Sequence, residues 1–164
     1  MTPSVRDANG DDIAAVHAIH AHHVLHGFGT FDEVPPAPGD YADKWREVVA
    51  MGLPWLVAVD GDEVVGFAYA SAFRPRSGYR YTLEDSVYIR DDRRGRGVGM
   101  ALLMPLIARC AAVGARQVVA VIGDSQNAGS IALHAKAGYA HAGTVRAVGF
   151  KLGRWSTSSS CSGR

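Results

Sequence analysis

The sequence has 164 residues, which is enough for one domain with a proper hydrophobic core. Its net charge is +1 with 20% charged residues, so no basic surface indicates a nucleic-acid partner, and 48% apolar content argues against disorder. No apolar run is long enough to cross a bilayer, and the N-terminus lacks the apolar core of a signal peptide. We expect a soluble protein without membrane partners.

Two features could suggest metal or disulfide chemistry. Cys110 and Cys161 form neither a disulfide framework nor a metal-ligand spacing, so a reducing cytoplasm is the expected compartment. Histidines recur at steps of three between residues 17 and 26. Such steps drift around a helix of about 3.6 residues per turn, and we therefore expect no specific metal site.

The first half of the chain predicts a strand, a helix, a loop, a second helix and a strand hairpin. Asp11 and Asp12 are expected to cap the first helix, and Asp60-Gly61 forms the hairpin turn. The expected bounds are Val5–Ala8, Ile13 to about His26, Gly27–Pro38, about Asp40–Met51, and Pro54–Val59 with Val64–Ala70.

The second half alternates strands with helices after a polar connection. Together with the first half it predicts an α+β domain built around one sheet. The expected elements are the connection Arg74–Tyr81, a strand Thr82–Ile89, a helix of about Gly97–Val113, a strand Val118–Gly123, a helix Ser130–Ala137 and a strand Ala147–Leu152.

A glycine-rich loop joins the strand ending at Ile89 to the following helix. Glycines 95, 97 and 99 let the backbone approach a phosphate, and the helix N-terminus favours an anion. The loop lacks the lysine of a P-loop and the third glycine of a dinucleotide fingerprint. It matches Arg-x-x-Gly-x-Gly, with Arg94, Gly97 and Gly99. The alternative is a solvated basic turn that only starts a helix.

That pattern resembles the pyrophosphate loop of the GCN5-related N-acetyltransferases (GNAT), which bind acetyl-CoA. The segment from Asn127 to Tyr139, with Ser130, Leu133, His134 and Gly138 between them, resembles the second conserved segment of this family. TLEDSVYI, GTVRAVGFKLGRW and the GTFDE loop look like its phosphinothricin and methionine-sulfoximine N-acetyltransferase branch. The resemblance covers about residues 3 to 155. It implies a mixed, mostly antiparallel sheet flanked by helices.

The resemblance assigns residues to acetyl-CoA, the implied co-substrate. The pantetheine arm is expected along the backbone of Val87, Tyr88 and Ile89, where an N–H can face the developing oxyanion. Asn127 and Ser130 are expected beside it. The pyrophosphate is assigned to Arg94, Gly95, Arg96, Gly97, Val98, Gly99 and Met100.

Catalysis needs a base, because the amine of an amino-acid-like substrate is mostly protonated near neutral pH. The resemblance assigns this role to Glu84, which would otherwise read as an outward strand carboxylate. Asp85 points to the opposite strand face and is the weaker candidate. His134 stands where many relatives have a tyrosine, and its acid, base or oxyanion role stays open. The alternative is that His134 has no catalytic role and is a helix histidine accommodated by packing.

The branch binds amino-acid analogues with a tetrahedral phosphinate or sulfoximine group. The positions that match its substrate pocket are Phe31, Glu33, Arg76 and Tyr79, with Arg74, Arg80 and Arg146 less directly matched. Each charge could equally be solvated surface. The resemblance implies a homodimer, with the pocket completed near its interface. Other small amines, or a CoA-binding module without catalysis, remain alternatives, and the natural substrate stays open.

The C-terminus departs from the branch. After Trp155 the branch continues as WLDVVxxQRP, whereas this chain reads STSSSCSGR. Removing one cytosine after the tryptophan codon turns a GC-rich coding sequence for WLDVVVLQRP into one for WSTSSSCSGR. We hypothesise a one-nucleotide frameshift, with a natural disordered tail as the alternative. The expected GNAT domain is therefore 1–155, the tail 156–164 is expected to be disordered, and the last strand of the sheet is expected to be missing.

Overall fold

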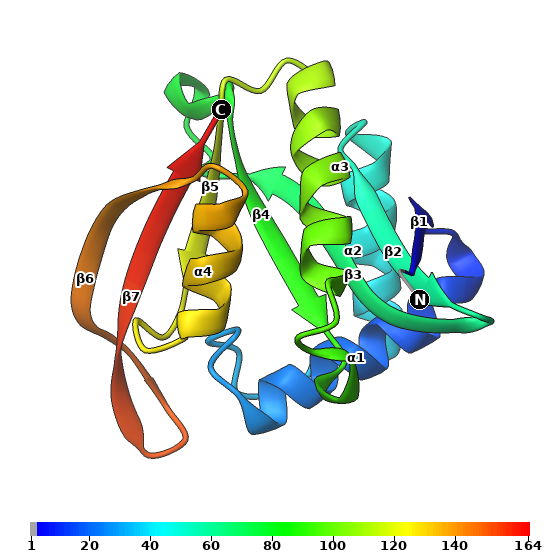
Figure 1. Ribbon diagram of the computed structural model, residues 1–164, viewed down its shortest axis with the longest axis horizontal. Coiled ribbons are helices and arrows are strands. Elements are labelled where there is room, and N and C mark those ends of the chain that lie inside the picture. The colour runs from blue at the N-terminus through cyan, green and yellow to red at the C-terminus, as the bar shows by residue number, and fades with distance from the viewer. Residues whose placement is uncertain (1–2) are drawn as a thin grey trace.

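The computed structural model describes residues 3–164 and contains one seven-stranded sheet between two layers of helices (Figure 1). Its order is β1-β2-β3-β4-β5-β7-β6, with β4 and β5 parallel and the other neighbours antiparallel. The elements are β1 (Ser4–Asp7), α1 (Ile13–His26), α2 (Pro38–Ala50), β2 (Trp55–Asp60), β3 (Glu63–Ala72), β4 (Thr82–Ile89), α3 (Val98–Ala112), β5 (Gln117–Ile122), α4 (Ala128–Lys136), β6 (Ala140–Lys151) and β7 (Arg154–Gly163).

The two sheet faces carry different cores. Helices α1 and α2 pack on an aromatic face, where Trp55 stacks on Tyr69 at 4.1 Å between ring centroids. Helices α3 and α4 cover the other face, and Leu102, Leu103 and Leu106 of α3 are completely buried there. Alternate residues of one strand therefore face different helix pairs.

Strands β4 and β5 separate at the centre of the sheet. They pair from Thr82 with Gln117 to Asp85 with Ala120, and β4 continues to Ile89 without β5 beside it. Figure 1 shows the two strands diverging toward α1. One edge of β4 is therefore left open along its second half.

The structure confirms the predicted α+β class and the order of the predicted elements as far as residue 139. Of the two predicted caps, Asp12 occupies the N-cap position of α1 but makes no side-chain capping bond to that helix. Asn9, rather than Asp11 or Asp12, caps the short 3-10 turn Gly10–Asp12 that precedes α1, by accepting from the Asp11 N–H. Asp12 instead accepts from the Asn9 N–H and from Arg6. The last strand before Gly153 is also longer than predicted, since β6 begins at Ala140.

The predicted disordered tail is wrong. Residues 154–163 form β7, which pairs with β5 on one side and β6 on the other, so the last strand is present. Ser156, Ser158, Ser159 and Cys161 are buried. Pairing along both edges occupies backbone N–H and C=O groups whatever the side chains are, which is why a serine-rich segment can lie inside the sheet.

Candidate active site

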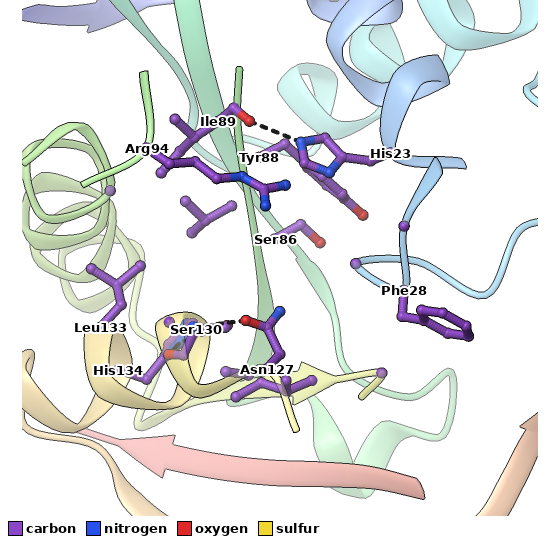
Figure 2. Close-up of a pocket in the computed structure, with 18 of the residues that line it drawn as sticks. His23, Phe28, Ser86, Tyr88, Ile89, Arg94, Asn127, Ser130, Leu133 and His134 are labelled. Atoms are coloured by element: carbon purple, nitrogen blue, oxygen red, sulfur yellow. Dashed lines mark hydrogen bonds between the residues drawn. The ribbon is translucent and has the colours of Figure 1, made fainter. Parts of the chain in front are cut away.

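A cavity of about 1000 Å³ opens where β4 and β5 diverge. Its walls are the second half of β4, the end of β5, the glycine loop with the start of α3, helix α4, and the loop after α1 (Figure 2). Every predicted acetyl-CoA residue except Arg96 lies on these walls, as do Glu84, His134 and Phe31.

The open edge of β4 presents backbone groups to the cavity. Just after β4, the Arg90 N–H donates to the Val65 carbonyl of the neighbouring strand β3. Residues of an antiparallel pair alternate in direction, so the N–H and C=O groups of Val87 and Ile89 point away from β3 and those of Tyr88 point toward it. The Ile89 carbonyl accepts from His23 Nε2 at 2.9 Å. Val87 is therefore the position whose backbone is best directed to the cavity. The predicted backbone contact of Tyr88 with the pantetheine arm is wrong, because the N–H and C=O groups of Tyr88 point toward β3.

The glycine loop has the backbone that its sequence predicts. Gly95 and Gly97 have φ angles of 72° and 83°, a region that favours glycine, and Gly97 immediately precedes α3. Gly99 serves packing instead, because a Cβ there would lie 3.0 Å from Leu133 and 3.1 Å from Ile89. Arg94 stands at this wall, while Arg96 is exposed outside it. The α3 N-terminus and these N–H groups suit a pyrophosphate.

Glu84 is a half-buried carboxylate on the cavity wall. Burial raises its pKa above the ordinary value, with a further contribution from Asp85, while the charges of Arg74 and Lys44 oppose the rise. A carboxylate with a raised pKa is a better proton acceptor than a fully solvated one.

Asp85 lies on the opposite face of β4, as predicted, and contacts His134 and Tyr139. His134 Nε2 is 3.1 Å from Asp85 Oδ1, and the Tyr139 hydroxyl donates to Asp85 Oδ2 at 2.7 Å. His134 Nδ1 lies 2.8 Å from the Ser130 carbonyl oxygen. Both ring nitrogens of His134 thus have protein partners.

The loop after α1 is attached to the β6–β7 hairpin. Lys151 is 1% exposed, and its Nζ donates to the Thr30 carbonyl at 2.7 Å. Burial lowers the pKa of Lys151, and the charges of Asp32 and Glu33 oppose that shift. The Arg154 guanidinium lies 3.9 Å from the centroid of the Phe28 ring.

Three predicted substrate residues lie outside the cavity wall. Glu33 is exposed on the first loop, and Arg76 and Tyr79 are exposed in the connection before β4. Sequence reasoning missed His23, Thr30 and Lys151. The apolar spacing of α1 indicates that His23 is buried, but no sequence signal pairs Lys151 with Thr30, because they are 121 residues apart.

Three of the α1 histidines, His17, His22 and His23, form hydrogen bonds with protein groups. His17 Nε2 contacts the Pro36 carbonyl at 2.8 Å, and His22 Nε2 contacts Asp91 at 2.7 Å. Within residues 3–164, no group of three or more His, Cys, Asp or Glu side chains is placed to hold a metal ion. Among the same residues, every helix falls short of the length and apolarity needed to cross a bilayer.

Comparison with known proteins identifies similar sequences and a similar fold. A model of the acetyltransferase (GNAT) family matches residues 19–139. Phosphinothricin N-acetyltransferase of Alcaligenes faecalis is 49% identical over 152 residues, covering 93% of this chain and 77% of that protein. The L-methionine sulfoximine/L-methionine sulfone acetyltransferase of Pseudomonas paraeruginosa is 42% identical over 159 residues, covering 94% and 90%.

A solved structure extends the match to three dimensions. The GNAT superfamily phosphinothricin acetyltransferase from Sinorhizobium meliloti, crystallised in complex with AcCoA, superposes with a TM-score of 0.96 at 41% identity. The match covers 99% of this chain and 88% of that one. These findings confirm the resemblance that the two sequence motifs predict.

Proposed function

The chain belongs to the acetyltransferase (GNAT) family and is an acetyl-CoA-dependent N-acetyltransferase, and we propose that it acetylates a small amino-acid analogue with Glu84 as base. The proposed acceptor is the α-amino group of a compound of the phosphinothricin or methionine sulfoximine type. The names of the two similar proteins support this class. The observation that carries the proposal is the half-buried Glu84 carboxylate, with its raised pKa, beside the open edge of β4.

When bound, acetyl-CoA supplies an activated thioester. The residues fit it, since the positive φ angles of Gly95 and Gly97 leave room for an anion at the N-terminus of α3. The backbone of Val87 would pair with the pantetheine arm, and its N–H is directed toward the side where an oxyanion develops. Asn127 would bind the same arm, although its Oδ1 also accepts from the Ser130 N–H at 3.1 Å. Glu84 takes the proton of the amine.

We assign acceptor recognition to the two segments beside Glu84. Phe31 lies on the cavity wall, and Arg74 is close enough for its charge to lower the pKa of Glu84. Glu33, Arg76 and Tyr79 are proposed to complete the acceptor site from the exposed segments that carry them. Cationic groups there suit a carboxylate and a phosphinate.

We also propose a homodimer formed through the β6–β7 hairpin. This hairpin exposes five large apolar side chains, namely Val145, Val148, Phe150, Leu152 and Trp155. Apolar side chains grouped in this way are typical of an interface. Sedimentation should give a dimer for the wild type and a monomer for Val145→Asp. A wild-type monomer at micromolar concentration would overturn the dimer.

We propose that the enzyme acts in the cytoplasm and that its activity serves detoxification and herbicide resistance.

The function is tested by thiol release from acetyl-CoA with L-phosphinothricin and L-methionine sulfoximine, and by mass spectrometry of the product. We expect turnover with both compounds and one acetyl group on the α-amine. Turnover confined to polyamines or aminoglycosides would overturn the acceptor class. Binding of acetyl-CoA without thiol release for any amine would favour the binding module.

A further inference from the structure

A buried polar cluster lies behind the cavity wall, on the α3 and α4 side of β4. It consists of Asp85, His134, Tyr139 and the Ser130 backbone, and the Asp85 and His134 side chains are 2% and 4% exposed. Strand β4 supplies Asp85, helix α4 supplies Ser130 and His134, and Tyr139 immediately precedes β6. His134 is both part of this cluster and part of the cavity wall.

The partners of His134 define its protons. The Ser130 carbonyl is only an acceptor, so Nδ1, 2.8 Å away, carries a proton. Asp85 already accepts from the Tyr139 hydroxyl through Oδ2, and His134 Nε2 faces its other oxygen. The contact of Nε2 with Asp85 Oδ1 fits two states, a neutral ring that accepts a proton from Asp85 or an imidazolium that donates to its carboxylate. The second state gives each Asp85 oxygen one donor.

The electrostatic surroundings support the same state. Burial opposes a charged imidazole, but the hydrogen bond and charge of Asp85, together with the Ser130 carbonyl, outweigh it and raise the pKa of His134. The other titratable groups whose charge interacts with Asp85 are Tyr139, Cys110 of α3, Cys161 of β7 and, from the opposite face of β4, Glu84. Burial raises the pKa of the Tyr139 hydroxyl and of both thiols, so these three groups stay uncharged near neutral pH.

We propose that Asp85 is a positioning residue that keeps His134 protonated on both ring nitrogens, so that His134 acts as the acid of the reaction and Glu84 as its base. This inference rests on the proposed acetyl transfer. It removes the role of base from the three that the sequence leaves open for His134, because a doubly protonated imidazole cannot accept a proton, and it selects the acid over the oxyanion donor. It also assigns Asp85, the weaker base candidate, a part in the same reaction.

The proton balance identifies which ring proton is used. In acetyl transfer the neutral amine forms a nitrogen–carbon bond to the thioester carbonyl, the carbon–sulfur bond breaks with its electron pair on sulfur, and the nitrogen gives up a proton to Glu84. Sulfur takes the Nδ1 proton of His134, which leaves a neutral ring whose Nε2–H still donates to Asp85. The Ser130 hydroxyl, 3.4 Å from Nδ1, is then available to donate to the vacated lone pair, whereas release of the Nε2 proton would leave a nitrogen lone pair against the Asp85 carboxylate. Solvent then removes the proton from Glu84 and returns one to His134.

The first test needs no acetyl-CoA. In the ¹⁵N-labelled unliganded chain, the ring nitrogens of His134 are followed by NMR against pH and assigned by their loss in His134→Gln. We expect both nitrogens to remain protonated above the ordinary histidine pKa of 6.5. In Asp85→Asn the same signals should titrate at lower pH. A His134 that is already neutral at pH 6.5 in the wild type would overturn the proposal, even if Asp85→Asn does not fold.

The second test is kinetic. Asp85→Asn should lower kcat by roughly 100-fold, as expected for loss of an acid–base group, with little change in the KM for acetyl-CoA. The fall of kcat at high pH should begin at a lower pH, since the acid loses its proton sooner. Asp43→Asn is the matched control, because it removes an exposed carboxylate paired with Arg46 on α2 and should change neither.

The two proposals fail separately. If the wild type acetylates no amine, the proposed function is wrong while the NMR titration still decides the state of His134. If the wild type is active and Asp85→Asn keeps its kcat and pH profile, Asp85 has no positioning role.

Discussion

Two neighbouring residues of β4 serve the cavity from opposite faces of the sheet. Glu84 faces the α1 and α2 side, and Asp85 reaches His134 on the side of α3 and α4. Neighbours in a strand normally have unrelated surroundings, because their side chains point apart. Here the divergence of β4 from β5 begins immediately after residue 85, so both faces meet at one opening.

The acidic limb of the pH profile should depend on Arg74. Its positive charge lowers the pKa of Glu84 against the effect of burial, so Arg74→Met should raise that pKa further. A base works only when deprotonated, and the rise of kcat/KM with pH should therefore move to higher pH. Arg80→Met is the control, since that guanidinium stacks on Tyr81 at 4.5 Å. If the acidic limb of Arg74→Met stays in place or moves to lower pH, the charge of Arg74 does not lower the pKa of Glu84.

At the scale of elements, the loop after α1 takes its position from the β6–β7 hairpin. A Cβ at Gly149 of β6 would lie 2.4 Å from the Phe31 ring, and one at Gly123 would lie 2.7 Å from the Phe28 carbonyl. Lys151 holds the same loop through the Thr30 carbonyl. The wall that carries Phe31 is thus built by close contact with glycine backbone far away in the sequence.

Gly149→Ala should therefore displace Phe31 from the cavity wall. We expect the KM for the amine to rise roughly fivefold or more, corresponding to about 1 kcal/mol, with the KM for acetyl-CoA little changed. Gly143→Ala on the same strand is the control, because nothing lies within 4 Å of a Cβ there. Steady-state kinetics with both substrates varied provides the measurement. Equal KM values for the amine in the two variants would exclude this role for the contact.

Sequence patterns predict the elements whose apolar side chains recur with the spacing of a strand or a helix. The bounds of β4 follow from alternation, and those of α1 from helical spacing. Strand β7 was missed, because a run of serines carries no apolar pattern while backbone pairing on both edges still forms the strand. The role of His134 was undecided, since Asp85 is 49 residues away in the chain and nothing in the spacing joins them.

At the scale of the whole molecule, the chain places a polar strand inside its sheet. Strand β7 buries Ser156, Ser158 and Ser159. The hydroxyl of Ser156 donates to the Gly123 carbonyl at 2.9 Å. We propose that this end arose by the one-nucleotide frameshift, which replaced apolar residues with serine. Resequencing decides the origin, and an intact reading frame for WSTSSSCSGR would end that proposal.

The double variant Ser158→Val/Ser159→Val should be more stable than the wild type. Burying two valine side chains in place of serine should raise the free energy of unfolding by roughly 2 kcal/mol, because apolar surface leaves water on folding. Urea denaturation provides the measurement. Ser160→Val, at a half-buried position of the same strand, is the control and should gain less. A double variant no more stable than the wild type would mean that the strand has no room for apolar side chains.

The central claim is that Glu84 removes the proton of the amine, and one comparison tests it most directly. The kcat of Glu84→Gln with L-phosphinothricin is measured against the wild type, with acetyl-CoA binding measured in parallel. Glutamine keeps the shape of the side chain but accepts no proton, so kcat should fall by about 10²- to 10⁴-fold while acetyl-CoA binding stays the same. A Glu84→Gln variant with the kcat of the wild type would contradict the account, because the proton would then leave by another route.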